Sequence, residues 1–206
     1  MNVKSPVGRR VAVAAGLVLA LGCGVAAQAS TTGPQTISGK AADVVTHRSG
    51  GSGGSGDKGT VATCSQEVLG VSALKEPADS EDARHLLLTV QNTGGKKCNL
   101  YRYPLVRLGA GRNTARVIEE SDPNPGVPVT LAPGEEAYAG LLVNGPMDEY
   151  EAKSITLGLQ GRKPGSSAGK PIDVPMPVET LYANDYQRVT YWTTAPGFAL
   201  DFIMSK

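Results

Sequence analysis

Between Val61 and the C-terminus, apolar residues recur at every second position of the chain. Leu86, Leu88 and Val90 alternate with neighbours that include Thr89 and Gln91, and further segments repeat the pattern at 127–131, 137–143, 154–159, 172–178 and 200–204. A period of two places alternate side chains on opposite faces of a strand, so each segment is predicted to be a β-strand with one apolar face. Such strands form antiparallel sheets that face a core on one side and water on the other.

Turn signals separate these segments. Gly, Pro and Asn cluster at 92–95, 109–111, 123–126, 133–134, 144–146, 163–165 and 196–197. Residues 61–206 are therefore predicted to be an all-β domain, an immunoglobulin-like antiparallel β-sandwich of about eight strands. Pro175 and Pro177 cannot donate ladder hydrogen bonds, which places their strand at a sheet edge. No segment shows a helical period, and Asp79–Arg84 is expected to form one helical turn at most.

Residues 1–29 have the form of a secretory signal peptide. Three basic residues and no acidic one lie within 2–10, and an unbroken apolar run follows from Val11 to Leu21. The run is shorter than the roughly 20 residues that a membrane-spanning helix needs. The small residues of Ala27-Gln28-Ala29 then offer a cleavage site that would leave Ser30 as the first residue.

A second interpretation of the same region is lipidation. The segment Leu19–Cys23 resembles a bacterial lipobox, with Ala20 where a leucine is usual. In that case Cys23 would be acylated and become the N-terminus, and it would hold the protein on the outer face of the cytoplasmic membrane.

Residues 30–60 are predicted to be a disordered, flexible linker. They contain no aromatic residue, their apolar residues show no period, and 50–56 consist only of Gly and Ser. Such a composition favours a tether over a folded segment. The glycines of this run match the spacing of a dinucleotide-binding fingerprint, but no strand or helix is predicted beside them, so that motif is rejected.

The charge of the chain excludes a dedicated nucleic-acid binder. Lys and Arg number 20 against 19 Asp and Glu, a formal net charge of +1, which gives no basic footprint. Removal of 1–29 takes away three basic residues, so the mature charge is 17 minus 19, or −2.

Cys64 and Cys98 are the only cysteines outside the export segment. In an oxidising compartment such a pair is expected to form a disulfide, which would stabilise a loop of this length by roughly 3–4 kcal/mol. The alternatives are two free thiols or half of a metal site. Neither cysteine has a second Cys or His at the spacing that zinc sites use, and no metal site is predicted.

Three stretches together resemble a known family. They are Leu88–Gly94, then Cys98–Pro104 (CNLYRYP), then Val129–Gly134 (VTLAPG). This pattern is similar to that of an actinomycete secreted family, the domain of unknown function DUF4232, which pairs an early Cys with a Cys in a C-x-L-x-G-Y-P motif. The resemblance implies an extracytoplasmic immunoglobulin-like sandwich with one disulfide, and it implies no activity. Arg102 stands where the family has Gly, so we expect the local backbone to depart from the family's bend.

Aromatic residues gather near the C-terminus, with Tyr182, Tyr186, Tyr191 and Trp192 inside eleven positions. If exposed, they could form a platform that stacks on sugar rings or on a protein partner. Because Tyr191 and Trp192 are neighbours on one predicted strand, at least one of them is expected to face the core.

Other candidate sites have simpler explanations. Acidic residues cluster at Glu76/Asp79/Glu81/Asp82, Glu119/Glu120/Asp122 and Asp148/Glu149/Glu151, but none has the alternating pattern of a calcium loop. Residues 165–169 match the G-x-S-x-G pattern, but they lie in a predicted turn and His85 is the one histidine outside the linker, so a serine hydrolase is rejected.

The sequence thus predicts no catalytic residue and no cofactor. The leading hypothesis is a non-enzymatic extracytoplasmic binding module, secreted or lipid-anchored, whose partner is an unknown envelope protein or polysaccharide. A cell-wall polysaccharide module that uses the C-terminal aromatic residues is the alternative, and a secreted enzyme with loop carboxylates is a third. Contact with a membrane is expected only through the signal peptide or a lipid at Cys23.

We predict that the exported protein begins at Ser30 and is recovered from the medium. N-terminal sequencing and detergent-phase partitioning measure this directly. A protein that partitions into detergent and carries an acylated Cys23 at its N-terminus would establish the lipoprotein alternative instead.

Overall fold

The computed structural model describes residues 60–110, 112–122 and 124–206. These residues belong to one compact unit of the chain, Gly53–Lys206. The predicted signal peptide, Cys23 and the predicted linker up to residue 59 lie outside the described residues.

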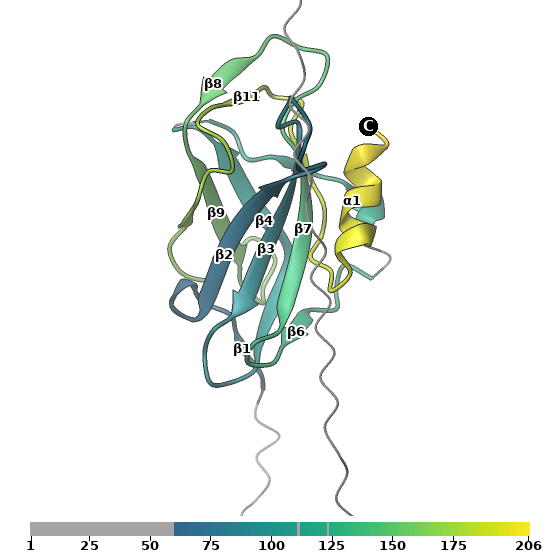
Figure 1. Ribbon diagram of the computed structural model, residues 1–206. Helices are drawn as coiled ribbons and strands as arrows, with labels where there is room; N and C mark the ends of the chain where they lie inside the picture. Colours follow the sequence, from purple (N-terminus) through teal and green to yellow (C-terminus); the bar gives the residue numbers. More distant parts are fainter. Residues whose placement is uncertain (1–59, 111, 123) are drawn as a thin grey trace, which may run out of the picture. The chain divides into compact units, whose positions relative to one another are not determined.

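One five-stranded sheet has the order β2-β3-β7-β12-β5 (Figure 1). Its strands are β2 (Leu69–Lys75), β3 (His85–Asn92), β7 (Glu136–Leu142), β12 (Arg188–Val189) and β5 (Arg116–Val117). Neighbours are antiparallel except for β12 and β5, which are parallel.

The second five-stranded sheet is built around β4 (Cys98–Leu108). Its order is β1-β4-β9-β10, and β6 also pairs with β4; the strands are β1 (Ala62–Thr63), β6 (Val129–Leu131), β9 (Ile155–Gln160) and β10 (Ile172–Val174). The β1–β4 pair is parallel, so the predicted purely antiparallel arrangement is wrong at one pair in each sheet.

Shorter elements complete the domain. β8 (Tyr150–Ala152) and β11 (Leu181–Ala183) form a two-stranded sheet at one end (Figure 1). Two 3₁₀ helices, η1 (Gln66–Val68) and η2 (Glu119–Ser121), lie in connections. Residues 79–84 form no helical turn; the Ser80 amide instead donates to the Pro77 carbonyl at 3.0 Å and closes a β-turn.

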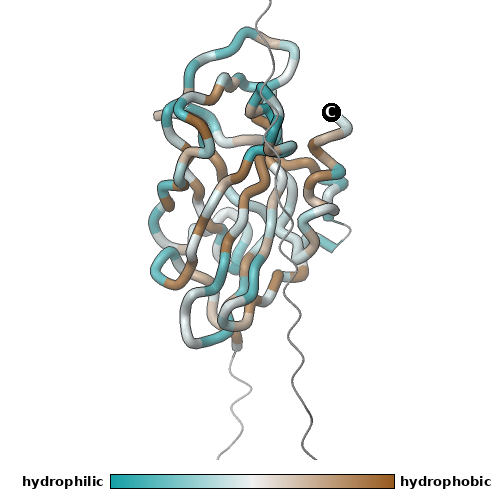
Figure 2. The backbone as a smooth tube through the Cα atoms, in the orientation of Figure 1, coloured by the Kyte–Doolittle hydropathy of each residue, from teal (hydrophilic) through white to brown (hydrophobic). Residues whose placement is uncertain are grey.

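The two large sheets pack against each other in a sandwich-like core. Leu86, Leu88 and Val90 of β3 are completely buried, as are Val106 of β4 and Leu157 of β9, and all five belong to one apolar cluster. Figure 2 shows apolar and polar residues alternating along the strands that carry these side chains. The structure therefore confirms the mostly β architecture and the strand that the alternation predicts at His85–Asn92.

The edge strand is also confirmed, but it is shorter than predicted. β10 ends at Val174, directly before Pro175, and it pairs only with β9. Pro175 and Pro177 lie beyond its end, because a residue without an N–H cannot extend the ladder.

The prediction of a strand at 200–204 is wrong, because Pro196–Met204 forms the helix α1. The apolar positions of this short segment fit both periods: Ala199 and Ile203, four residues apart, are both completely buried. Pro196 in the first turn, where no intrahelical N–H is needed, favours the helix. No helix among residues 60–206 that the structure describes is long and apolar enough to cross a membrane.

α1 covers the outer face of β7 and part of β3 (Figure 1). Ile203 packs with Leu142 and Ile118 in a second, smaller apolar cluster. Gly140 makes this contact close, since a Cβ atom at this position would lie 2.5 Å from the Ala199 carbonyl oxygen. β7 is therefore buried on both faces, against the core and against the helix.

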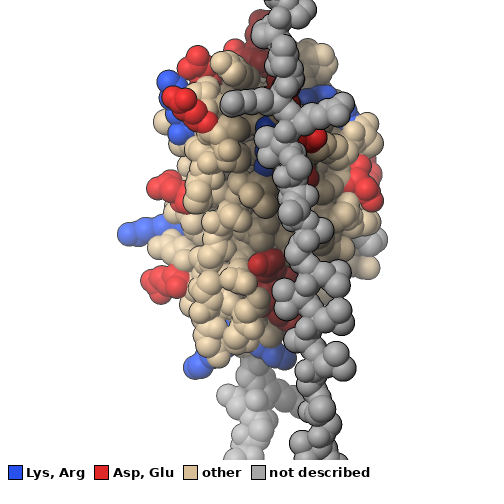
Figure 3. Space-filling model, in the orientation of Figure 1, with Lys and Arg blue, Asp and Glu red and all other residues tan. Residues whose placement is uncertain are grey.

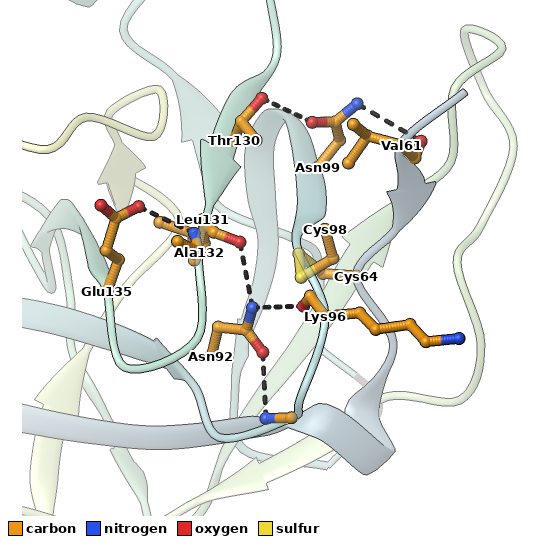
Figure 4. The surroundings of a disulfide bond; sticks show 11 residues. Val61, Cys64, Asn92, Lys96, Cys98, Asn99, Thr130, Leu131, Ala132 and Glu135 are labelled. Carbon is orange, nitrogen blue, oxygen red and sulfur yellow. Dashed lines mark hydrogen bonds between the residues drawn. A yellow bond between two sulfur atoms is a disulfide. The ribbon is translucent and has the colours of Figure 1, made fainter. Parts of the chain in front are cut away.

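Cys64 and Cys98 form the predicted disulfide (Figure 4). Both residues are buried, and β1, just before Cys64, pairs with β4 at Cys98. The buried Asn92 lies nearby and joins two loops, since its Nδ2 donates to the carbonyls of Lys96 at 2.9 Å and Leu131 at 3.0 Å. This end of the sandwich is thus held both covalently and by buried hydrogen bonds.

We predict that Gly140→Ala destabilises the domain by about 1–3 kcal/mol, because the added methyl group would overlap the backbone of α1. Gly197→Ala is the matched control, since a Cβ atom there meets nothing within 4 Å. Urea unfolding of both variants measures the difference, and equal midpoints would contradict the close approach of helix and strand.

Candidate functional site

The four C-terminal aromatic residues do not form one exposed platform. Tyr191 and Trp192 are only 6% and 4% exposed, Tyr186 is half-buried, and Tyr182 is 57% exposed. The expectation that at least one of Tyr191 and Trp192 faces inward is met by both, because Trp192 enters the main core and Tyr191 packs on Tyr103. Burial removes both rings from any surface that could stack on a ligand.

Tyr191 has a structural role. Its ring meets that of Tyr103 edge-on, with centroids 5.2 Å apart, and its hydroxyl donates to the Glu119 carboxylate at 2.9 Å. Burial, followed by this hydrogen bond to a carboxylate, raises the pKa of Tyr191 to about 12. The side chain therefore stays protonated at physiological pH and links the Glu119 loop to the core.

Tyr186 is held between two neighbours. A Cβ atom at position 145 would lie 2.1 Å from its ring, so the glycine lets the ring pack on the backbone there. The Arg188 guanidinium carbon lies 4.6 Å from the centroid of the Tyr186 ring, a cation–π contact. Tyr186 thus packs against the protein itself.

Tyr182 lies on β11 and lines a cavity of about 370 Å³. We call this the end cavity. Three connections form it: Glu81–Arg84 before β3, Asn144 and Glu149 between β7 and β8, and Val178, Thr180 and Tyr182 at and before β11. Figure 3 shows acidic and basic side chains together at the end of the domain where Figure 1 places β8 and β11.

Asn144 holds these walls together. Its Nδ2 donates to Glu149 Oε1 and to the Tyr182 carbonyl, both at 2.8 Å. Arg84 Nε donates to the Asn144 carbonyl at 3.4 Å, and Arg84 Nη2 donates to the Lys206 carbonyl at 3.1 Å. The Asn144 amide therefore connects the β7–β8 loop to β11, and the Arg84 guanidinium connects the same loop to the segment before β3.

The end cavity brings together two of the three acidic clusters of the sequence. Glu81 and Asp82 come from one cluster and Glu149 from another, while Glu119, of the third, accepts the hydrogen bond from Tyr191. Within the described residues, no three His, Cys, Asp or Glu side chains lie where they could hold a metal ion. The cavity thus offers carboxylates, one guanidinium and an aromatic ring, a set that suits a polyhydroxylated or cationic ligand.

Sequence reasoning missed part of this site. Asn144 belongs to a recognised turn signal, but nothing local indicates that its side chain would reach Glu149 and β11. Arg84 lies in a polar segment with no distinguishing pattern. The two residues are brought to Tyr182 only by the pairing of strands that are distant in the sequence.

Arg102 has an unusual backbone conformation for a residue other than glycine. Its φ is +57°, in the left-handed region that favours glycine, at the point where the β4–β9 register shifts. A non-glycine residue in this region costs about 1–2 kcal/mol. The backbone at Arg102 therefore adopts a conformation that suits glycine, the residue of the related motif.

The fold and this site define a disulfide-linked, sandwich-like β-domain with a cavity formed mainly by loops at one end. The model of the domain of unknown function DUF4232 matches residues 64–193, and the chain belongs to that family. Comparison with curated proteins finds no match. Comparison with solved structures also finds none.

His85, next to Arg84 in the chain, makes stability depend on pH. Its Nε2 atom is buried with no hydrogen-bond partner among the described residues. Burial, and then the nearby Arg84 charge, lowers the pKa of His85 below its usual 6.5. The unfolded chain consequently binds more protons than the folded one as pH falls below about 6.5, so stability decreases there.

We predict that the urea midpoint of the protein falls between pH 7.5 and pH 5.5, and that His85→Leu reduces this fall. The only other histidine, His47, lies outside the domain, so it supplies the matched control as His47→Leu. If His85→Leu keeps the full pH dependence, the effect does not come from His85.

Proposed function

We propose that the domain is a non-enzymatic extracytoplasmic binding module whose ligand occupies the end cavity. The single observation that supports this most is the exposed Tyr182 ring beside a polar cavity with ordered walls. An aromatic ring that is open to solvent and held next to hydrogen-bonding groups is the usual arrangement for recognition of an amphipathic ligand.

The hydrogen bonds around Asn144 support a preformed site. The Asn144 amide holds the Glu149 carboxylate and the backbone of Tyr182 together, so this wall of the cavity is ordered before any ligand binds. A site that is ordered in advance loses less entropy on binding, which favours affinity.

The composition of the lining supports a carbohydrate as the ligand. Sugars present an apolar face to an aromatic ring and hydroxyl groups to carboxylates and guanidinium groups. Glu81, Asp82 and Glu149 outnumber Arg84, so an amino sugar with a positive charge would gain further. The polysaccharide hypothesis therefore rests on Tyr182 alone among the four aromatic residues that the sequence singles out.

We predict that Tyr182→Ala lowers retention on purified cell-wall polysaccharide by about tenfold, since one aromatic anchor often carries this much binding energy. Tyr182→Trp keeps the stacking surface and is expected to keep binding. Co-sedimentation with insoluble wall material measures the retained fraction.

Phe198→Ala is the matched control, because Phe198 is an exposed ring on α1 that does not line the end cavity. Variants of Tyr191 and Trp192 are unsuitable here, because their rings are buried and their loss would disturb the fold. Equal retention of wild type and Tyr182→Ala would refute the proposed site, and hydrolysis of the bound polymer would contradict a non-enzymatic role.

A further inference from the structure

A second concave surface, which we call the arginine groove, lies on the sheet that contains β4. Its cavity is about 310 Å³ in volume. Asn99, Tyr101 and Arg102 of β4 form one side, and Arg162 of the β9–β10 connection forms another. The loop before β6 closes it with Pro125, Gly126 and Pro128.

The Arg102 side chain is fixed in this groove. Its Nη1 donates to the Gly161 carbonyl at 2.9 Å and its Nη2 to the Arg162 carbonyl at 3.1 Å. The Arg102 carbonyl in turn accepts a hydrogen bond from the Trp192 amide at 2.9 Å. Because backbone and guanidinium are both held, the strained left-handed backbone places a positive charge in a constant position.

This charge has no protein counterion among the described residues. The one ion pair found there within 4.0 Å joins Lys153 and Glu151, and no Asp or Glu lines the groove. Arg102 is half-buried, so water screens it less than an exposed arginine. Two of its five N–H donors reach carbonyl oxygens, and the others find no acceptor in the part of the chain that the structure describes.

We propose that the arginine groove binds an oxyanion, the phosphate or carboxylate group of a polymer, between Arg102 and Arg162. Planar guanidinium groups donate paired hydrogen bonds to such groups. The groove is a separate site from the end cavity and differs from it in the sign of its charge, so this inference goes beyond the proposed function. A carboxylate and a phosphodiester share the chemistry that the groove recognises.

The test uses the purified protein with three soluble polymers of similar length: polyglycerol phosphate, a polyuronate and neutral dextran. We expect one or both of the anionic polymers to bind at low ionic strength, with an affinity that falls as salt is added. Any binding of neutral dextran, which the end cavity could support, is expected to be independent of salt and of the groove arginines. The comparison between the two anionic polymers identifies which oxyanion is preferred. Polyanion binding that added salt does not weaken would overturn the proposal.

Arg102→Gly is the central variant, because glycine adopts the left-handed backbone easily while the guanidinium is lost. Arg162→Gln removes the second charge from an exposed loop, where no effect on folding is expected. Each is expected to weaken polyanion binding by about tenfold.

Arg107→Gln is the matched control, since Arg107 is exposed on the same strand but outside the groove. This variant is expected to change the affinity for the polyanion less than twofold. Tyr182→Ala, which removes the aromatic ring of the end cavity, is also expected to change it less than twofold. The cell-wall experiment and this one therefore test the two proposed sites separately. Unchanged binding by both groove variants, an equal loss in Arg107→Gln, or no polyanion binding by the wild type would each refute the proposal.

Discussion

The packing of the two large sheets through one apolar face each is the interaction on which the rest of the structure depends. The fully buried side chains of β3 on one sheet and of β4 and β9 on the other form a single cluster. Burial of this surface is the main force that favours folding, and it sets which face of every strand is inside. The connecting loops are free of this requirement; they form most of the end cavity, and with residues of β4 they form the arginine groove.

The helix α1 adds a second layer of packing that changes the burial pattern of β7. A strand with one covered face would alternate in burial, yet β7 is buried from Ala139 to Leu142 without interruption. The helix reaches the strand because residue 140 has no side chain. Leu142, which the alternation places on the outer face, thereby joins Ile203 and Ile118 in a small core of its own.

The two concave surfaces differ in sign of charge and in how they are held. In the end cavity, the amide of Asn144 and the guanidinium of Arg84 connect loops, and carboxylates predominate. In the arginine groove, a guanidinium is itself the fixed group and no acid lines the surface. We therefore propose different ligand groups for the two surfaces, a neutral or cationic sugar for the end cavity and an oxyanion for the arginine groove.

The amino-acid sequence alone was sufficient to predict the principal strands and the covalent link. The period of two located the principal strands, the pair of cysteines identified the disulfide, and the motifs around Cys98 identified the family. These signals are local or covalent, so they can be read without knowledge of distant residues. Which outward faces are covered depends on tertiary packing. That packing buries both Tyr191 and Trp192, where the sequence required only one of them to face inward, and it places the helix of 196–204 on β7. It also decided that Arg84, Asn144 and Tyr182 meet, because their proximity depends on strands far apart in the chain whose pairing no local pattern specifies.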